Sequence, residues 1–337
     1  MEKIGVIGAG SWGIALANLL ANNGHDVTVW SIIEDEINML NDKHEHVDKL
    51  PGVKLNDTLK YTTSLKDAMQ DKKILVLAVP SPFIRSTAHS MKDFYEEGQV
   101  IVNVAKGIEE STLMILTDVV EDEIPGSTVC VLSGPSHAEE VGRGLPTLVV
   151  VGAKKKEDAM LLQNVFMNSV FRVYTSADML GIELGASLKN VVALAAGIAD
   201  GLGFGDNVKA ALITRGITEI SRLGVAMGGH AETFSGLTGI GDLIVTCASM
   251  HSRNRRAGIL IGQGKSYEEA MDEVKMVVEG VYSAKAAMGL AKKYNVPLPI
   301  IEQVNNILFN GMPAREALGN LMIRDKKIEH PNVEWEA

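Results

Sequence analysis

Short, uniformly apolar segments recur through the first half of the chain and predict β-strands. They are rich in Val, Ile and Leu and lack the alternation of a half-exposed strand. They cover residues 3–7, 27–30, 74–79, 100–104, 129–132, 147–151 and 170–173. Helical patterns lie between them, for example at residues 111–120 and 157–166. This alternation predicts an α/β fold, a doubly wound parallel sheet of the Rossmann type with helices on both faces.

The pattern changes near residue 178, after which helical periodicity dominates. The expected helices cover residues 179–202, 207–223, 266–276, 283–294, 300–309 and 313–321. Glycine-rich joints at residues 201–205 and 236–241 separate some of them. We therefore expect a Rossmann domain over residues 1–176 and an all-helical domain over residues 177–337.

A glycine-rich turn lies between the first apolar segment and an amphipathic stretch. Gly8 permits a tight turn, Gly10 lets the backbone approach a ligand, and Gly13 lets the following helix pack closely on the strand. The free N–H groups and the dipole of such a helix attract an anion. With a second strand candidate at residues 27–30, the spacing predicts a dinucleotide site whose pyrophosphate lies at the helix N-terminus.

Composition narrows the class of protein. The 337 residues are 46% hydrophobic, enough for more than one core. A formal net charge of −10 argues against nucleic-acid or anionic-membrane partners, although a local basic site remains compatible with it. Only Cys130 and Cys247 occur, which favours a reducing cytoplasm, and the first residues predict no secretory signal. The longest apolar helical run, residues 191–199, is too short to span a bilayer.

Chemically useful side chains follow two of the expected strands. In a doubly wound sheet, ligands bind beyond the carboxyl ends of the strands. Lys106 follows the strand at residues 100–104, where it is either an active-site ammonium or a solvated surface lysine. Gly134, Pro135 and Ser136 follow the strand at residues 129–132 and are interpreted as a turn that opens a helix with Pro at its first position, a geometry that favours anions.

The helical half contains an unusual glycine pattern before a lysine. Gly181, Gly185 and Lys189 share one helix face at spacings of four. Each glycine inside a helix costs about 1 kcal/mol relative to Ala, which suggests close approach of another group to that face. Apolar neighbours would lower the pKa of Lys189 and suit it to proton transfer, although it could also snorkel off a core helix.

Two further segments carry candidate site residues. Asp242 follows a glycine-rich turn, where it either caps a helix or orients a lysine. Residues 252–256 (Ser-Arg-Asn-Arg-Arg) form a basic cluster in an acidic protein, and Arg253 with Asn254 could hold a phosphate. Arg255 and Arg256 could equally be plain surface charges. The eight histidines lack the spacing of a metal site, so we expect no metal.

With these residues in view, the chain resembles the soluble NAD(P)-dependent glycerol-3-phosphate dehydrogenases over residues 3 to about 323. The resemblance rests on a combination of motifs: GAGSWG, AVPS, AKGIE, LSGPS, GIELGASLKNVVALAAGI, TRGITE, GLTGIGDLIVTC, SRNRR and Val278-Glu279-Gly280-Val281. It implies reduction of dihydroxyacetone phosphate to sn-glycerol 3-phosphate and the reverse, with NADH or NADPH. It also implies a supply of glycerol 3-phosphate for phospholipid synthesis, a homodimer and a cytoplasmic location.

The resemblance also implies roles for individual residues. Lys189 exchanges the proton with the substrate oxygen, Lys106 contacts substrate near the cofactor, and Asp242 completes the catalytic group. The substrate contacts it implies are Lys106, Gly134, Ser136, Lys189, Asp242, Ser252, Arg253 and Asn254. Beside the glycine loop of Gly8, Gly10 and Gly13, the cofactor contacts it implies are Ser11, Trp12, Lys106, Ala138, Arg253, Val277 and Glu279.

The chain departs from the family after the second strand. Ile32 and Ile33 stand where members that prefer NADPH commonly have a basic residue, and no Asp or Glu ends the strand. We therefore expect no strong preference for NADPH. Lys43 or Lys49 could still supply a cation for the 2′-phosphate.

Two other functions remain compatible with the residues alone. One is a hydroxyacid or ketopantoate type of dehydrogenase on the same plan, against which the basic segment and two lysines favour a phosphorylated ketone. The other is a non-catalytic dinucleotide sensor, which would not need Lys106, Lys189 and Asp242.

Overall fold

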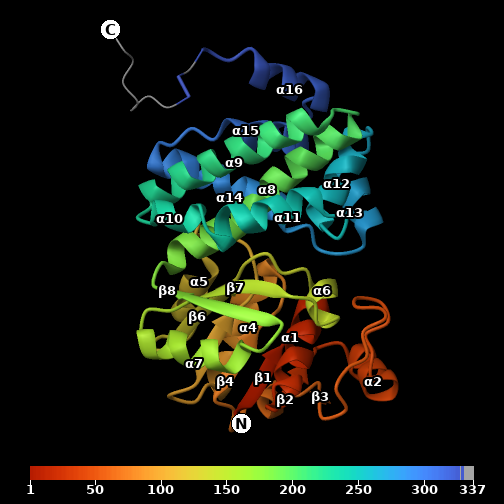
Figure 1. Ribbon diagram of the computed structural model, residues 1–337, viewed down its shortest axis with the longest axis vertical. Helices are drawn as coiled ribbons and strands as arrows, with labels where there is room; N and C mark the ends of the chain where they lie inside the picture. The colour runs from red at the N-terminus through yellow and green to blue at the C-terminus, as the bar shows by residue number, and fades with distance from the viewer. Residues whose placement is uncertain (327, 330–337) are drawn as a thin grey trace.

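The N-terminal part of the computed structural model is an α/β sandwich (Figure 1). The structure describes residues 1–326, 328 and 329, and within them one sheet has eight strands. The strands are β1 (Lys3–Ile7), β2 (Asp26–Trp30), β3 (Lys60–Thr62), β4 (Ile74–Leu77), β5 (Val100–Asn103), β6 (Thr128–Ser133), β7 (Thr147–Gly152) and β8 (Phe171–Ser176).

The sheet has the order β3-β2-β1-β4-β5-β6-β7-β8, and its first six strands are parallel. This is the Rossmann order, with the change of direction between β1 and β4. The expectation of a wholly parallel sheet was wrong for the last two strands. β7 pairs antiparallel with β6, and β8 pairs parallel with β7, so both run opposite to the other six strands. Leu148 in β7 and Tyr174 in β8 are exposed, so the elements that cover the sheet leave part of this edge open. The sequence also missed β3, which is only three residues long and largely polar.

Helices cover both faces of this sheet and bury two separate apolar layers. Alternate residues of β4 point to opposite layers, Ile74 and Val76 to one, and Leu75 and Leu77 to the other. The helices are α1 (Ser11–Asn22), α2 (Glu34–Lys43), α3 (Leu65–Met69), α4 (Ile84–Met91), α5 (Leu116–Glu123), α6 (Ala138–Gly142) and α7 (Lys156–Phe166), with the 3-10 turns η1 (Ser81–Phe83) and η2 (Lys92–Phe94).

One expected helix of this part starts later than the sequence indicated. A helix was expected over residues 111–120, but α5 begins at Leu116. Leu113 has a left-handed φ of 62°, and a bridge between Ile108 and Ile115 holds the preceding turn. Such a backbone cannot belong to a right-handed helix, so the apolar spacing at residues 111–115 reflects packing of a turn.

The described residues after Ser176 are helical up to Met322 and form the upper half of the molecule in Figure 1. The elements are α8 (Met179–Gly201), α9 (Asp206–Ala226), α10 (Ala231–Phe234), the π-turn η3 (Leu237–Gly241), α11 (Asp242–Ala248), α12 (Arg253–Gly262), α13 (Tyr267–Val274), α14 (Glu279–Tyr294), α15 (Pro299–Phe309) and α16 (Ala314–Met322). The sequence indicated α8, α9 and α13 to α16, but missed α10 to α12, whose short or polar sequences show little apolar periodicity.

Helix α8 is the centre of the helical part. It covers the range expected from the sequence. Its 23 residues make it, among the described residues, the one helix long and apolar enough to cross a membrane by length and composition, so the expectation that the longest apolar run is too short was wrong on that criterion. Within the protein, 94% of its most apolar window is buried. α12 packs tightly against it, since a Cβ on Gly197 would lie 2.2 Å from the carbonyl oxygen of Arg255 and one on Gly258 would lie 2.3 Å from that of Leu194.

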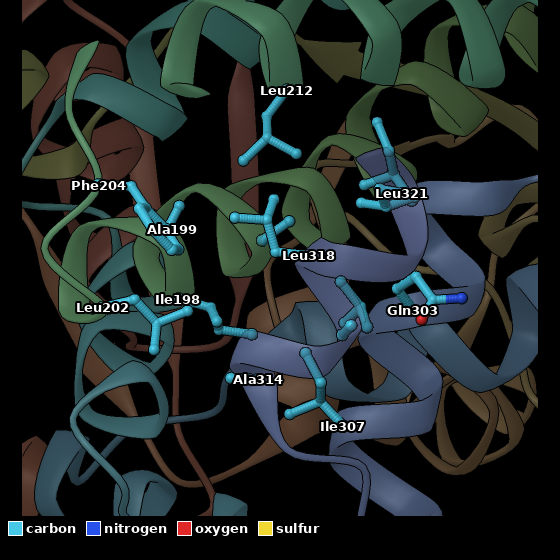
Figure 2. Close-up of a pocket in the computed structure, with 14 residues that line it drawn as sticks. Ile198, Ala199, Leu202, Phe204, Leu212, Gln303, Ile307, Ala314, Leu318 and Leu321 are labelled. Carbon is cyan, nitrogen blue, oxygen red and sulfur yellow. The ribbon is translucent and has the colours of Figure 1, made fainter. Parts of the chain in front are cut away.

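A mainly apolar hollow lies between α8, α9, α15 and α16 (Figure 2). Aliphatic side chains such as Ile198, Leu212 and Leu318 line it, and Gln303 is its polar member. It contains none of the side chains that the sequence assigned to the site, so we attribute it to the packing of α16 on the core.

Candidate active site

The glycine turn between β1 and α1 leaves room for a ligand at the edge where β1 and β4 end. Gly8 has φ +122°, and a Cβ on Gly13 would lie 2.0 Å from the Gly8 carbonyl oxygen, so both are required by the backbone. A Cβ on Gly10 would meet no atom of the described chain within 4 Å. Within the described residues no side chain caps α1, whose N-terminal N–H groups remain available to a phosphate.

Side chains from both halves of the chain meet beside this turn. Glu279, at the start of α14, accepts hydrogen bonds from the Ser81 amide (3.1 Å) and hydroxyl, just beyond β4. Arg253 donates to the Val277 carbonyl oxygen at 3.3 Å. Trp12 Nε1 is buried and finds no partner among the described residues. An unpaired donor beside an open glycine turn fits a dinucleotide.

The expected residue Ala138 lies on the same side of the sheet, as the first residue of α6, which packs against α1. The turn before it differs from the expectation. Pro135 does not open a helix, because α6 begins three residues later with His137 in the capping position. Gly134 instead adopts φ +146°, and its carbonyl oxygen accepts hydrogen bonds from Ser136 Oγ and Lys106 Nζ, both at 3.0 Å.

One carboxylate joins the two candidate lysines. Asp242 Oδ1 lies 2.5 Å from Lys189 Nζ, and Asp242 Oδ2 lies 2.8 Å from Lys106 Nζ. The side chain of Lys189 is 6% exposed and that of Lys106 is 18% exposed, so neither is a solvated surface lysine. Asp242 does not cap α11, where Gly241 occupies the capping position. The structure thus brings two ammonium groups to one carboxylate at the carboxyl ends of β5 and β6.

The glycines of α8 explain how Asp242 reaches Lys189. A Cβ on Gly185 would lie 2.6 Å from the Thr238 carbonyl oxygen, so η3 packs directly on α8 and delivers Asp242 at the start of α11. Gly181 serves a different purpose, since its Cβ would lie 2.2 Å from Oδ2 of Asp178, the residue that caps α8. The groups that approach this face of α8 closely are therefore the backbone of η3, at Gly185, and the side chain of Asp178, at Gly181.

Burial and charge act against each other at this cluster. Burial lowers the pKa of Lys189 to about 7, and the charge of Lys106 adds to this, although Asp242 opposes it. Burial alone would raise the pKa of Asp242, but Lys106 and Lys189 outweigh it and hold that pKa below its usual value. A carboxylate that stays ionised beside an amine that titrates near neutrality is suited to proton transfer.

Sequence reasoning missed Thr246 in this cluster. Its Oγ1 accepts a hydrogen bond from Lys189 Nζ at 2.6 Å and donates to the Asp242 carbonyl oxygen at 2.6 Å. The signal was its place four residues after Asp242, which puts both on one face of a helix. Thr246 fixes the direction of the Lys189 ammonium without adding charge.

The basic segment divides into separate roles. Ser252 caps α12 by accepting from the Arg255 amide at 3.2 Å. Arg255 is bound to Asp200, with Nε to Oδ2 at 2.9 Å, and is therefore neither a phosphate ligand nor a free surface charge. Asn254 donates to Asn190 Oδ1 at 3.0 Å, and its own oxygen accepts from the backbone. Asn254 thus links α12 to Asn190, the residue that follows Lys189 in α8.

No group of three His, Cys, Asp or Glu side chains that could hold a metal ion occurs in residues 1–326, 328 and 329.

Comparison with known proteins places the chain in a family. The model of the NAD-dependent glycerol-3-phosphate dehydrogenase N-terminus matches residues 3–159, and that of the C-terminus matches residues 178–319. Glycerol-3-phosphate dehydrogenase (NAD(P)+) of Agathobacter rectalis is 65% identical over 99% of this chain and 100% of its own length. The enzyme of that name from Fusobacterium nucleatum is 62% identical over 98% of this chain and 99% of its own length.

A solved structure agrees with these matches. Glycerol-3-phosphate dehydrogenase from Coxiella burnetii superposes with a TM-score of 0.93 at 36% identity, covering 96% of this chain and 99% of that one. Both halves of the sequence, their order and their arrangement in space are thus shared, and the chain belongs to the NAD-dependent glycerol-3-phosphate dehydrogenase family.

Proposed function

We propose that this protein interconverts dihydroxyacetone phosphate and sn-glycerol 3-phosphate with NAD(P)H, and so supplies glycerol 3-phosphate for phospholipid synthesis. The observation that carries the proposal is the Lys106–Asp242–Lys189 cluster at the end of a Rossmann sheet. The names of its relatives support the same substrate and cofactor.

Lys189 is the proton donor in reduction and the acceptor in oxidation. NAD(P)H held at the glycine turn would supply a hydride for the ketone carbon, and negative charge would then develop on the ketone oxygen. The Lys189 ammonium neutralises that charge and delivers a proton, while Lys106 adds electrostatic stabilisation. Asp242 and Thr246 hold the Lys189 amine in place through the hydrogen bonds described above.

The substrate phosphate is assigned to Arg253 and Asn254, with Gly134, Ser136 and Ser252 lining the site. Val277 takes one of the five N–H donors of Arg253, and Asn190 takes one of the two amide hydrogens of Asn254. The remaining donors suit a phosphate, and holding that phosphate fixes the ketone relative to the hydride.

The cofactor is assigned to the glycine turn and to the side chains around it. Gly8, Gly10, Ser11 and Gly13 present the N-terminus of α1 to the pyrophosphate. The further cofactor contacts are assigned to Trp12, Lys106, Ala138, Arg253, Val277 and Glu279. In support, Trp12 has a buried donor that no described residue satisfies.

The decisive assay compares two ketones. Dihydroxyacetone phosphate should oxidise NADH or NADPH, whereas unphosphorylated dihydroxyacetone should react negligibly, because Arg253 and Asn254 would have nothing to hold. Nicotinamide absorbance measures both rates. Equal rates would contradict the phosphate contacts, and no turnover with either ketone would favour the dinucleotide sensor.

Organisation and location are also proposals. The proposed domain boundary lies near residue 176, between the end of β8 at Ser176 and the start of α8 at Met179. The buried free thiols Cys130 and Cys247 support a cytoplasmic location. The homodimer rests on the family resemblance, and an acidic net charge of −10 supports the absence of a nucleic-acid partner.

A further inference from the structure

In a Rossmann protein, the residues at the end of β2 contact the adenine ribose and determine the preference between NAD and NADP. An acidic side chain there commonly binds the 2′-hydroxyl of NAD, and a cation accommodates the 2′-phosphate of NADP. In this chain Ser31 follows β2 directly, and Ile32 and Ile33 come next, 79% and 48% exposed. The isoleucines offer no polar group to either cofactor.

A buried carboxylate gathers polar groups behind this position. Ser31 Oγ accepts from the Ile33 amide at 3.1 Å and donates to Glu36 Oε2 at 2.7 Å. Lys49 Nζ, from the loop after α2, forms an ion pair with Glu36 Oε1. His46 Nε2 faces the same oxygen at 3.7 Å, and His46 Nδ1 accepts from the Lys49 amide at 3.3 Å. Two consecutive contacts thus connect the Lys49 ammonium, through Glu36, to Ser31, the residue that follows β2.

Lys49 is partly exposed to solvent, whereas Glu36 is largely buried. The Lys49 side chain is 33% exposed and that of Glu36 is 11% exposed. Burial works to raise the pKa of Glu36, but His46, Lys49 and Ser31 outweigh it and lower that pKa to about 2, so the group is a carboxylate at neutral pH. An ammonium has three donors, and one contact to Glu36 leaves others for a ligand.

We propose that Lys49, held by Glu36, is the cation that receives the 2′-phosphate of NADP. Glu36 neutralises the charge of Lys49 and so limits the preference for NADP over NAD. The inference rests on the proposed use of a nicotinamide cofactor. The Lys49–Glu36 pair carries no net charge. It therefore offers the 2′-phosphate a hydrogen-bond donor without a strong positive potential, so the protein accepts both NAD and NADP. Lys43, the other lysine considered from the sequence, lies exposed at the end of α2.

Calorimetric titration of the full-length protein with NAD+ and NADP+ tests this inference without turnover. Lys49→Gln should weaken NADP+ binding by roughly ten- to a hundredfold, the value of a lost charge-assisted bond, and leave NAD+ within about twofold. Glu36→Gln keeps an acceptor oxygen for Lys49 but removes the negative charge, so it should tighten NADP+ binding several-fold relative to NAD+. The two substitutions therefore move the ratio of dissociation constants in opposite directions.

Matched variants separate this role from folding. Lys49→Arg should keep NADP+ binding, and Lys43→Gln should change neither constant, while thermal unfolding shows that each variant is folded. Equal effects of Lys49→Gln on both dinucleotides, or no effect, would overturn the proposal, as would a shift of Glu36→Gln toward NAD+. If the unmodified protein binds neither dinucleotide, the proposed function fails with it; if both bind and the ratio does not respond, this inference alone fails.

Discussion

The Lys189 amine is placed where burial and charge oppose one another. Its neighbours supply both a counter-ion, Asp242, and a second positive charge, Lys106. The protein buries Lys189 and Asp242 and leaves Lys106 18% exposed. The result is an amine whose pKa is lowered to about 7 although it touches a carboxylate. A proton donor works best when its pKa is near the working pH, so this environment is chemically useful.

Replacing Lys189 tests its role directly. Lys189→Ala should lower kcat for ketone reduction by roughly 10²–10⁴-fold, the usual effect of removing a general acid. Cofactor affinity, measured by titration with NAD+, should change little. Lys154→Ala is the control, since Lys154 is an exposed lysine between β7 and α7, paired with Glu121 of α5. Turnover within a few-fold of the parent protein would reduce Lys189 to a structural lysine.

The pH profile of the unmodified protein checks the same assignment. Reduction needs the Lys189 ammonium, so kcat/KM for dihydroxyacetone phosphate should fall as the pH rises through about 7. Oxidation of glycerol 3-phosphate needs the neutral amine, so its kcat/KM should rise over the same range. Parallel profiles for the two directions would contradict a single proton-exchanging lysine.

At the scale of secondary structure, one close contact between a helix and a turn places the catalytic carboxylate. Gly185 lets the backbone of η3 lie against α8, and α11 then starts at Asp242 with its side chain facing Lys189. The π-turn is irregular because Gly239 also packs on the backbone of Phe234.

A single methyl group should disturb this arrangement. Gly185→Ala would place a Cβ 2.6 Å from the Thr238 carbonyl oxygen, so η3 must move and carry Asp242 away from the lysines. We expect a loss of roughly 1–3 kcal/mol in the free energy of unfolding and a roughly ten- to hundredfold lower kcat.

The matched control is Gly319→Ala in α16, where a Cβ meets no described atom within 4 Å. That substitution should stabilise the protein by up to about 1 kcal/mol, because Ala favours a helix over Gly, and leave kcat unchanged. Urea denaturation and steady-state rates measure both variants. A Gly185→Ala protein that matches the parent in kcat would show that η3 does not position Asp242.

At the scale of the whole molecule, α8 joins the two halves of the chain through buried hydrogen bonds. Glu183 Oε1 accepts from Asn103 Nδ2 at 3.1 Å and from the Thr117 amide at 3.2 Å, and Thr117 Oγ1 contacts Oε2. Ser187 Oγ donates to the Gly107 carbonyl oxygen at 2.8 Å. Because Asn103 ends β5, these contacts hold the loop that carries Lys106 against the helical part.

The titration of Glu183 predicts a pH-dependent stability. Burial raises its pKa from 4.5 to about 7, against the hydrogen bonds from Thr117 and Asn103. The folded protein therefore binds this proton more tightly than the unfolded chain. The stabilisation is complete below about pH 4.5 and is lost as the pH rises through about 7.

Glu183→Gln removes that dependence. The amide oxygen can replace Oε1, and the amide nitrogen can donate to Thr117 Oγ1, as a protonated carboxyl would. Relative to the parent, the variant should gain stability between pH 5 and pH 8, on the order of 1–3 kcal/mol. Urea denaturation at several pH values measures this, and Glu219, whose pKa is also raised to about 7, is present in both proteins and cancels. A constant difference across the range would contradict the raised pKa.

Local sequence determined much of this architecture. The strand–glycine turn–helix at Gly8 to Gly13, the alternation of strands and helices and the long α8 could all be predicted, because each depends on residues close in the chain. The candidates Lys106, Lys189 and Asp242 could be named for the same reason, since strand ends and helix faces show where polar groups leave an apolar element.

The remaining features depend on packing between distant segments. The reversal of β7 and β8, the three-residue β3 and the position of α5 are set by which surfaces meet, and their apolar patterns do not distinguish the outcomes. The joining of two lysines to one carboxylate, the pairing of Arg255 with Asp200 and the hold of Glu36 on Lys49 bring together residues from separate elements. The sequence by itself determined which groups were available; only the tertiary structure decided which of them lie within hydrogen-bonding distance, because that distance is fixed by helix and strand packing and not by spacing along the chain.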